Sequence, residues 1–196
     1  KSWIDVYVMN RLGTIKDGKP IYPMFVTETH IAKEEIPVAA GNPLYVGLDF
    51  GLPPAAVIGQ KVRGRWFVQA EIVAFDMGIV RFAEVLREEI ATRFSETSEV
   101  HIFGDPAGDF RAQTDESTPF HVLRGAGLRA YPAPSNSVDL RLESVNSQLN
   151  KMSEGKPAFL VDRRCVQLIK GFEGGYQYRR MEVSGERYAD KPDKNM

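Results

Sequence analysis

The stretch that decides the fold is residues 44–75, which read LYVGLDFGLPPAAVIGQKVRGRWFVQAEIVAF. Three apolar runs, at 44–50, 55–62 and 66–75, are separated by Gly, Pro and Arg-Gly turns, and this pattern predicts three consecutive strands. Arg63-Gly64 is typical of a hairpin turn. Three antiparallel strands in succession therefore open the core.

Downstream of this stretch the pattern alternates between helix and strand. Residues 78–94 predict an amphipathic helix, followed by short strands at 100–105 and 127–131. Further helices are expected at 138–152 and 164–172, with a strand at 158–161 between them, and no periodicity is evident after Gly175. The order predicts an α/β fold, a mixed sheet of three antiparallel strands followed by parallel strands and flanked by helices.

Length and charge limit the possible classes. The 196 residues are 43% hydrophobic and carry a formal net charge of -1, which suits one sizeable core and no strongly basic surface. Any contact with nucleic acid must come from a local basic patch. The sequence has no apolar run long enough for a membrane helix and no apolar leader, so we expect a soluble, intracellular protein that is not secreted. A single cysteine, Cys165, excludes a disulfide framework.

Three common catalytic motifs are absent. Residues 13–19 have the glycine and lysine spacing of a phosphate-binding loop, but Pro20 stands where a hydroxyl should contact Mg²⁺. The three histidines lack the spacing of a zinc helix, and no Gly-x-Ser-x-Gly elbow appears.

Two aspartates stand out because each lies at a glycine-bounded position on a predicted central strand. Asp49 lies in Gly47-Leu48-Asp49-Phe50-Gly51, and Asp105 ends the strand expected at 100–105 and precedes Pro106. An isolated carboxylate buried in an apolar strand costs several kcal/mol unless it is paired. Two carboxylates at strand ends suit Mg²⁺ or Mn²⁺. Two such ions about 3.5–4 Å apart activate water and stabilise the leaving oxygen in phosphodiester cleavage.

Other charged residues are weaker candidates. Asp109 and Glu71 are possible auxiliary ligands, although a helix-start aspartate and an outward-facing strand glutamate are the ordinary interpretations. Cations near the hairpin and near the acids are candidates for phosphate contact beside the acidic site: Lys61, Arg63, Arg65, Arg111 and Arg141. Aromatic and basic residues are not interleaved along the sequence, so no stacking surface for single strands is predicted.

These motifs, in this order, resemble the C-terminal nuclease domain of large terminase subunits from tailed bacteriophages. The resemblance covers about the whole chain. It rests on Gly47–Gly51, the hairpin and Gly104–Gly108, supported by residues 17–23 with Phe25 and His30, by 139–146, and by the closing 191–196. It implies a ribonuclease H-like fold, with residues 1–43 as the segment joining an ATPase domain to the nuclease domain and residues 44–196 as the nuclease domain without its final helix.

The resemblance also implies an activity: metal-dependent cutting of concatemeric viral DNA during genome packaging in the cytoplasm of an infected bacterium. Asp49 and Asp105 match the family's first and second metal-binding acids. The third acid lies in a Ser-His-x-x-Asp-Ala helix beyond the Lys-Asn segment, whereas this sequence stops at Met196. A site with two of three acids is expected to hold Mg²⁺ or Mn²⁺ more weakly. The implied partners are double-stranded DNA, the ATPase domain of the same polypeptide, the small terminase subunit and the portal.

Two alternatives remain open from the sequence. One is a catalytically silent module that docks on DNA or on the portal. The other is a fragment of an actin-like or sugar-kinase ATPase, whose first phosphate loop also carries Gly-x-Asp-x-Gly and a hairpin.

Overall fold

The structure, a computed structural model, describes residues 18–106, 118–181 and 188–192. Its internal contacts divide the chain into two units. The larger unit spans residues 28–165, and the smaller one combines the described residues before Glu28 with those from Val166 onward. No helix in these ranges is long and apolar enough to cross a membrane.

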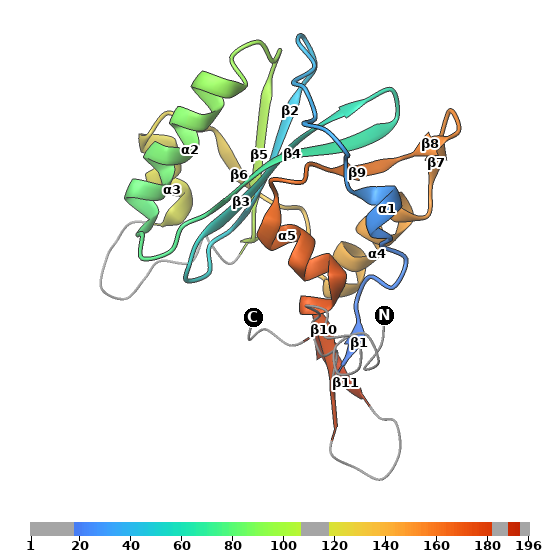
Figure 1. The fold of residues 1–196 in the computed structure, drawn as a ribbon. Helices are drawn as coiled ribbons and strands as arrows, with labels where there is room; N and C mark the ends of the chain where they lie inside the picture. The colour runs from blue at the N-terminus through green and yellow to red at the C-terminus, as the bar shows by residue number, and fades with distance from the viewer. Residues whose placement is uncertain (1–17, 107–117, 182–187, 193–196) are drawn as a thin grey trace. The chain divides into compact units, whose positions relative to one another are not determined.

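The larger unit is built on a six-stranded mixed sheet with the order β6-β5-β2-β3-β4-β9 (Figure 1). The antiparallel pairs are β2–β3 and β3–β4, while β2–β5, β5–β6 and β4–β9 are parallel. The predicted arrangement of three antiparallel strands followed by parallel ones is confirmed. The strands are β2 (Leu44–Asp49), β3 (Ala55–Val62), β4 (Arg65–Val73), β5 (Val100–Gly104), β6 (Ala130–Pro132) and β9 (Phe159–Val161).

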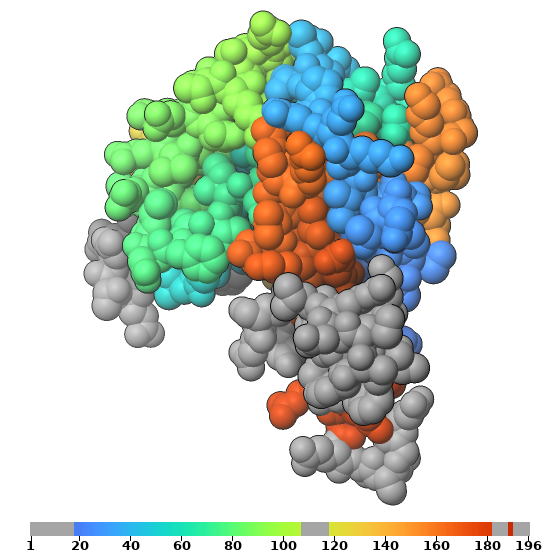
Figure 2. Space-filling view, viewed as in Figure 1, coloured from blue at the N-terminus to red at the C-terminus, as the bar shows by residue number. Residues whose placement is uncertain are grey.

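Helices cover the two faces of this sheet unequally. Helices α2 (Ile79–Arg93) and α3 (Pro119–Gly125) lie together on one face, and α4 (Val138–Leu149) lies on the other (Figure 1). The main core lies between α2 and the sheet. Figure 2 shows the outer surface of α2, in green, covering this part of the molecule. Alternate residues of β2 meet the fully buried Phe82 and Leu86 there. Each such side chain contributes roughly 1.5–3 kcal/mol when buried.

Several element boundaries differ from the predictions. Helix α3 was not predicted, because seven residues are too few to show a helical repeat; its signal is the cap, where Thr118 accepts a hydrogen bond from the backbone N–H of His121 ahead of Pro119. Strand β6 starts at Ala130 rather than 127, and α4 ends at Leu149 rather than 152. The helix expected at 164–172 is α5 (Val166–Lys170), followed by a π-helical turn, η3 (Gly171–Gly175).

The smaller unit contains a three-stranded sheet that the polar C-terminal sequence did not predict. Its strands are β1 (Lys19–Pro20), β10 (Gln177–Arg180) and β11 (Tyr188–Pro192), in the order β1-β10-β11. The ring of Phe172 packs against Tyr22 and Phe25, at centroid distances of 5.0 and 4.7 Å.

The remaining short elements are α1 (Thr27–His30) and the β7–β8 hairpin of Met152–Ser153 and Lys156–Pro157.

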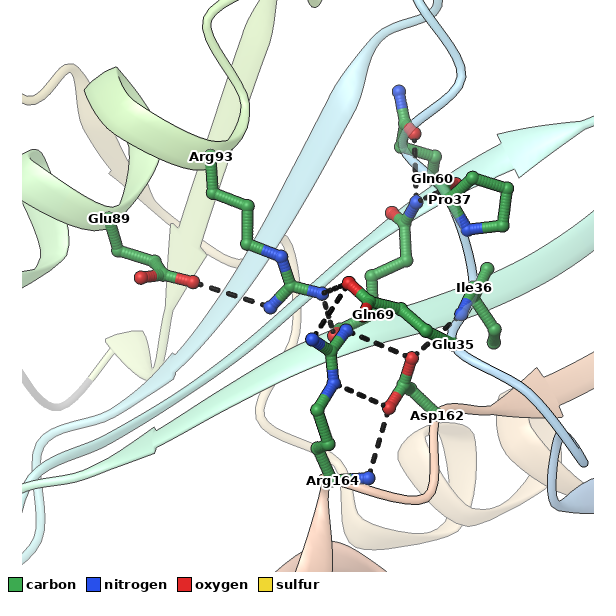
Figure 3. Close-up of polar contacts among 9 residues, drawn as sticks. All are labelled: Glu35, Ile36, Pro37, Gln60, Gln69, Glu89, Arg93, Asp162 and Arg164. Carbon is green, nitrogen blue, oxygen red and sulfur yellow. Dashed lines mark hydrogen bonds and ion pairs between the residues drawn. The ribbon is translucent and has the colours of Figure 1, made fainter.

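Buried polar side chains attach residues 36–42 to the larger sheet. Figure 3 shows those that contact Ile36 and Pro37. Gln60 accepts from the backbone N–H of Ala39 at 2.8 Å and donates to its carbonyl at 3.0 Å. Gln69 donates to the Pro37 carbonyl at 2.7 Å. These bonds hold the backbone of Pro37 and Ala39 against β3 and β4.

Candidate functional site

The two aspartates singled out in the sequence lie beside each other at one end of the sheet. Strands β2 and β5 are parallel neighbours with Leu48 opposite Gly104. The next residues along the chain are Asp49, which ends β2, and Asp105, which directly follows β5. Neighbouring strands lie about 4.8 Å apart, so the two carboxylates project from adjacent backbone positions. Leu48 and Gly104 face the α2 core, and by the two-residue alternation both aspartates face the opposite side of the sheet.

The environments of the two carboxylates differ. Asp49 is exposed, and its Oδ1 accepts a hydrogen bond from the backbone N–H of Gly51 at 3.1 Å. The expectation of a carboxylate buried within an apolar strand is wrong, because Asp49 is the last residue of β2 and water solvates it. Asp105 is half-buried: Asn136 Nδ2 donates to its Oδ1 at 2.9 Å, and Arg141 Nη1 lies 3.8 Å from its Oδ2.

Residues at the start of α4 and just before it hold Asp105 in place. Arg141 Nη1 donates to Asn136 Oδ1 at 2.8 Å, so one side chain orients the other toward the aspartate. Sequence reasoning named Arg141 but missed Asn136. The available signal was its position in the Ser135-Asn136-Ser137 run that leads into α4, a run that has the composition of a helix cap.

Gly104 permits close packing directly beneath this pair. A Cβ on Gly104 would lie 2.5 Å from the ring of Phe50, which itself packs edge-to-face on the buried ring of Phe120 at 5.0 Å. Phe50 follows Asp49 and Gly104 precedes Asp105. The packing of the two rings against β5 therefore helps to fix the spacing of the carboxylates.

Substituting Gly104 by Ala should destabilise the protein by about 1–3 kcal/mol, because the new methyl group must displace a packed aromatic ring. Urea unfolding measures this change. Gly125→Ala is the matched control, since a Cβ there meets nothing within 4 Å. Equal stability of the two variants would show that Phe50 moves away without cost.

Glu71 lies on the same face as Asp49 but two strands away. Gly47 of β2 pairs with Val57, which pairs with Glu71, and this places the Glu71 backbone about 10 Å from β2. Across the part of the chain that the structure describes, no group of three or more His, Cys, Asp or Glu side chains is placed to hold a metal ion. Asp109 lies outside the described residues, so both auxiliary roles stay predictions.

The basic hairpin lies far from the carboxylates. Strands β2 and β3 are antiparallel, so Ala55 is opposite Asp49 whereas Lys61 is six residues further along, about 20 Å away. The expectation that these cations flank the acidic pair is therefore wrong. Arg65 Nε donates to the Pro157 carbonyl at 2.8 Å and Arg63 is exposed at the turn, while Arg111 lies outside the described residues. Of the five candidate cations, Arg141 alone is shown next to the pair.

Comparison with known structures identifies the fold. The P22 large terminase nuclease domain superposes with a TM-score of 0.59 at 15% identity, covering 88% of this chain and 84% of that domain. This chain has the large-terminase nuclease fold. The same fold occurs in the nuclease domain of bacteriophage SPP1 g2p, solved with bound Mn, at a TM-score of 0.52 and 19% identity, with 83% of this chain and 88% of that domain covered.

The terminase nuclease fold also occurs within a longer protein. The large terminase of a thermophilic bacteriophage, solved in complex with ADP, matches with a TM-score of 0.67 and 22% identity over 92% of this chain. The chain spans only 42% of that longer terminase. No family model and no curated protein sequence matches the chain.

Proposed function

We propose that this chain is a divalent-metal-dependent DNA endonuclease domain that cuts concatemeric viral DNA during genome packaging. The observation that carries the proposal is the register of Asp49 and Asp105 at the ends of two parallel central strands. The terminase nuclease fold supports it, and so do the structures of that fold that contain Mn or cobalt.

The donor set fits a hard cation. Carboxylate oxygens are the ligands that Mg²⁺ and Mn²⁺ prefer, and Asp49 and Asp105 would supply them. When bound, two such ions lower the pKa of bound water and stabilise charge on a departing oxygen. The backbone N–H of Gly51 orients Asp49, and Asn136 orients Asp105. Arg141 offers a positive charge beside the pair, where a DNA phosphate would lie.

The proposed setting is the cytoplasm of an infected bacterium. The partners would be double-stranded DNA, an ATPase domain of the same polypeptide, the small terminase subunit and the portal. The longer terminase from the thermophilic bacteriophage supports the ATPase part of this proposal, because it was solved with ADP and is more than twice as long as the matched region.

Supercoiled plasmid tests the activity. We expect nicking and linearisation with Mn²⁺ or Mg²⁺ and none in EDTA. Absence of cleavage at millimolar concentrations of either ion contradicts the proposal.

A second candidate, a catalytically silent module docking on DNA or on the portal, is favoured by the lack of a third acidic ligand among the described residues. Metal-independent plasmid binding without cleavage would support this second candidate.

Replacing Arg63 by Ala tests whether the basic hairpin contacts DNA. We expect the slope of log K against log salt concentration to fall by about 1, because one phosphate contact is lost. Filter binding to a short duplex in EDTA measures the slope. Arg87→Ala is the control, since Arg87 is an exposed cation on α2, on the opposite face of the sheet. An unchanged slope for Arg63→Ala removes the hairpin from the DNA-binding surface.

A further inference from the structure

The sheet face that carries Asp49 and Asp105 contains an apolar groove. It has a volume of about 300 Å³. Gly47, in the middle of β2, leaves it hollow, because a Cβ at this position would meet no atom within 4 Å. The lining of this groove includes Tyr45, Gly47, Trp66 and Phe103.

Aromatic rings from several strands gather at this groove. Tyr45 packs edge-on against Trp66 and stacks on His101, with both centroid distances 5.1 Å. Phe103 is 39% exposed, and Tyr131 of β6, opposite it in register, is 55% exposed. The sequence predicted no stacking surface because these residues come from β2, β4, β5 and β6. The sheet brings them together on one face, which the order of residues along the chain does not indicate.

Charge is distributed unevenly along the groove. At the hairpin end, Lys61 Nζ lies 5.7 Å from the centroid of the Trp66 ring, and Arg63 is exposed at the turn. At the other end lie Asp49 and Asp105. Tyr45 and Asp49 are four residues apart on β2, a span of about 13 Å. A strand of DNA lying here would have cations near its phosphates at one end and the acidic pair at the other.

We propose that this aromatic groove binds unpaired bases of a single DNA strand, with the strand's backbone running from Lys61 toward Asp49 and Asp105. Stacking on Tyr45, Trp66 and Phe103 requires an open base face, which paired bases inside a duplex do not offer. The ligand is therefore a frayed or cut end. This inference rests on the proposed function, because the nuclease role is what makes DNA the expected ligand.

Binding to oligothymidylate and to an abasic oligonucleotide of equal length tests the groove. The measurement is made in EDTA, so that it does not depend on cleavage. Trp3→Phe leaves Trp66 as the only tryptophan, and we expect its fluorescence to be quenched by oligothymidylate. Oligothymidylate should bind about tenfold more tightly than the abasic strand, because stacking one base on an aromatic ring lowers the dissociation constant by about that factor.

Two variants remove the groove in opposite ways. Trp66→Ala deletes a ring, and Gly47→Leu fills the hollow while keeping every ring. With labelled strands, each should lose the preference for oligothymidylate and keep its affinity for the abasic strand. Phe75→Ala is the control, because Phe75 is 64% exposed but lies outside this groove. Equal affinity of the unaltered protein for both strands overturns the proposal, as does full preference in Gly47→Leu.

Three further outcomes separate this proposal from others. A dimer in sedimentation velocity that Gly47→Leu abolishes would assign the groove to a second copy of the chain and overturn DNA binding there. Plasmid cleavage without a preference for oligothymidylate contradicts the proposal for the groove and leaves the proposed nuclease function standing. A preference without cleavage supports the groove and contradicts the proposed nuclease function.

Discussion

Asp49→Asn is expected to reduce metal-dependent plasmid cleavage by about 100-fold or more, because it removes one of the two adjacent carboxylates available to a cation. Its folding stability should change by less than about 0.5 kcal/mol, since Asp49 is exposed at the end of β2 and its hydrogen bond from the Gly51 N–H competes with water. Cleavage rates in Mn²⁺ and thermal unfolding of the same sample separate the two effects.

Two variants complete this experiment. Asp105→Asn should cause a comparable loss of cleavage, because Asp105 occupies the matching position directly after β5. Asp139→Asn, an exposed acid in the first turn of α4, should cleave normally. If Asp49→Asn cleaves as fast as the unaltered protein, Asp49 does not belong to the active site.

Asp162→Ala is expected to destabilise the larger unit by about 2–4 kcal/mol. The side chain of Asp162 is fully buried directly after β9. Its oxygens accept from the Ile36 backbone N–H at 2.8 Å, from the Arg164 backbone N–H at 3.0 Å, and from Arg164 Nε and Nη2 at 2.9 and 3.1 Å (Figure 3). Removing the carboxylate leaves the Ile36 N–H without its acceptor. Urea unfolding measures the loss.

The ion pair beside Asp162 provides the control. Arg164 also contacts Glu35 at 2.8 Å, and Arg93 Nη2 lies 3.9 Å from the same oxygen (Figure 3). Because Glu35 is 61% exposed, Glu35→Gln should cost less than about 1 kcal/mol. If Glu35→Gln and Asp162→Ala lower the free energy of unfolding equally, the burial of Asp162 does not explain its contribution to stability.

The pH dependence of stability tests the charge on Asp162. Burial raises the pKa of this carboxyl, but hydrogen bonds from the Arg164 side chain and from the backbone of Ile36 and Arg164 outweigh it, so the pKa lies below its usual value of 3.8. A carboxyl whose pKa is lower in the folded state than in the unfolded state stabilises the protein at any pH above its unfolded-state pKa. This stabilisation is lost as the pH falls through the folded-state pKa. The stability difference from Asp162→Asn should be constant at neutral pH and shrink below about pH 4.

Local patterns predicted the elements that bury a regular face. The alternation of Leu44, Val46 and Leu48 and the helical repeat of α2 are set by the core beneath them, so periodicity found both. The proximity of Asp49 and Asp105 was also predicted, because each stands beside glycine at the end of an apolar strand in the sequence.

Features that depend on distant segments could not be predicted. The buried amides of Gln60 and Gln69 bind the backbone of Ala39 and Pro37, more than twenty residues away. Strand β10 pairs with β1 across most of the chain, and its polar residues show no buried face. The side-chain contact of Asn136 with Asp105 likewise exists only after β5 and β6 pair.

The attachment of residues 31–42 has a mechanical consequence. This segment is bonded in sequence through Ala32 to Val161 and through Ile36 to Asp162. Closer to β2 it is bonded through Ala39 to Gln60, Gly41 to Glu96 and Asn42 to Gln60. A pulling force applied to the chain before Ile31 would load these bonds one after another, starting at the β9 edge. Strand β2, with Asp49 at its far end, would bear tension only after all of them had broken. The segment therefore protects β2, the strand that carries Asp49, from a force that pulls on the preceding chain.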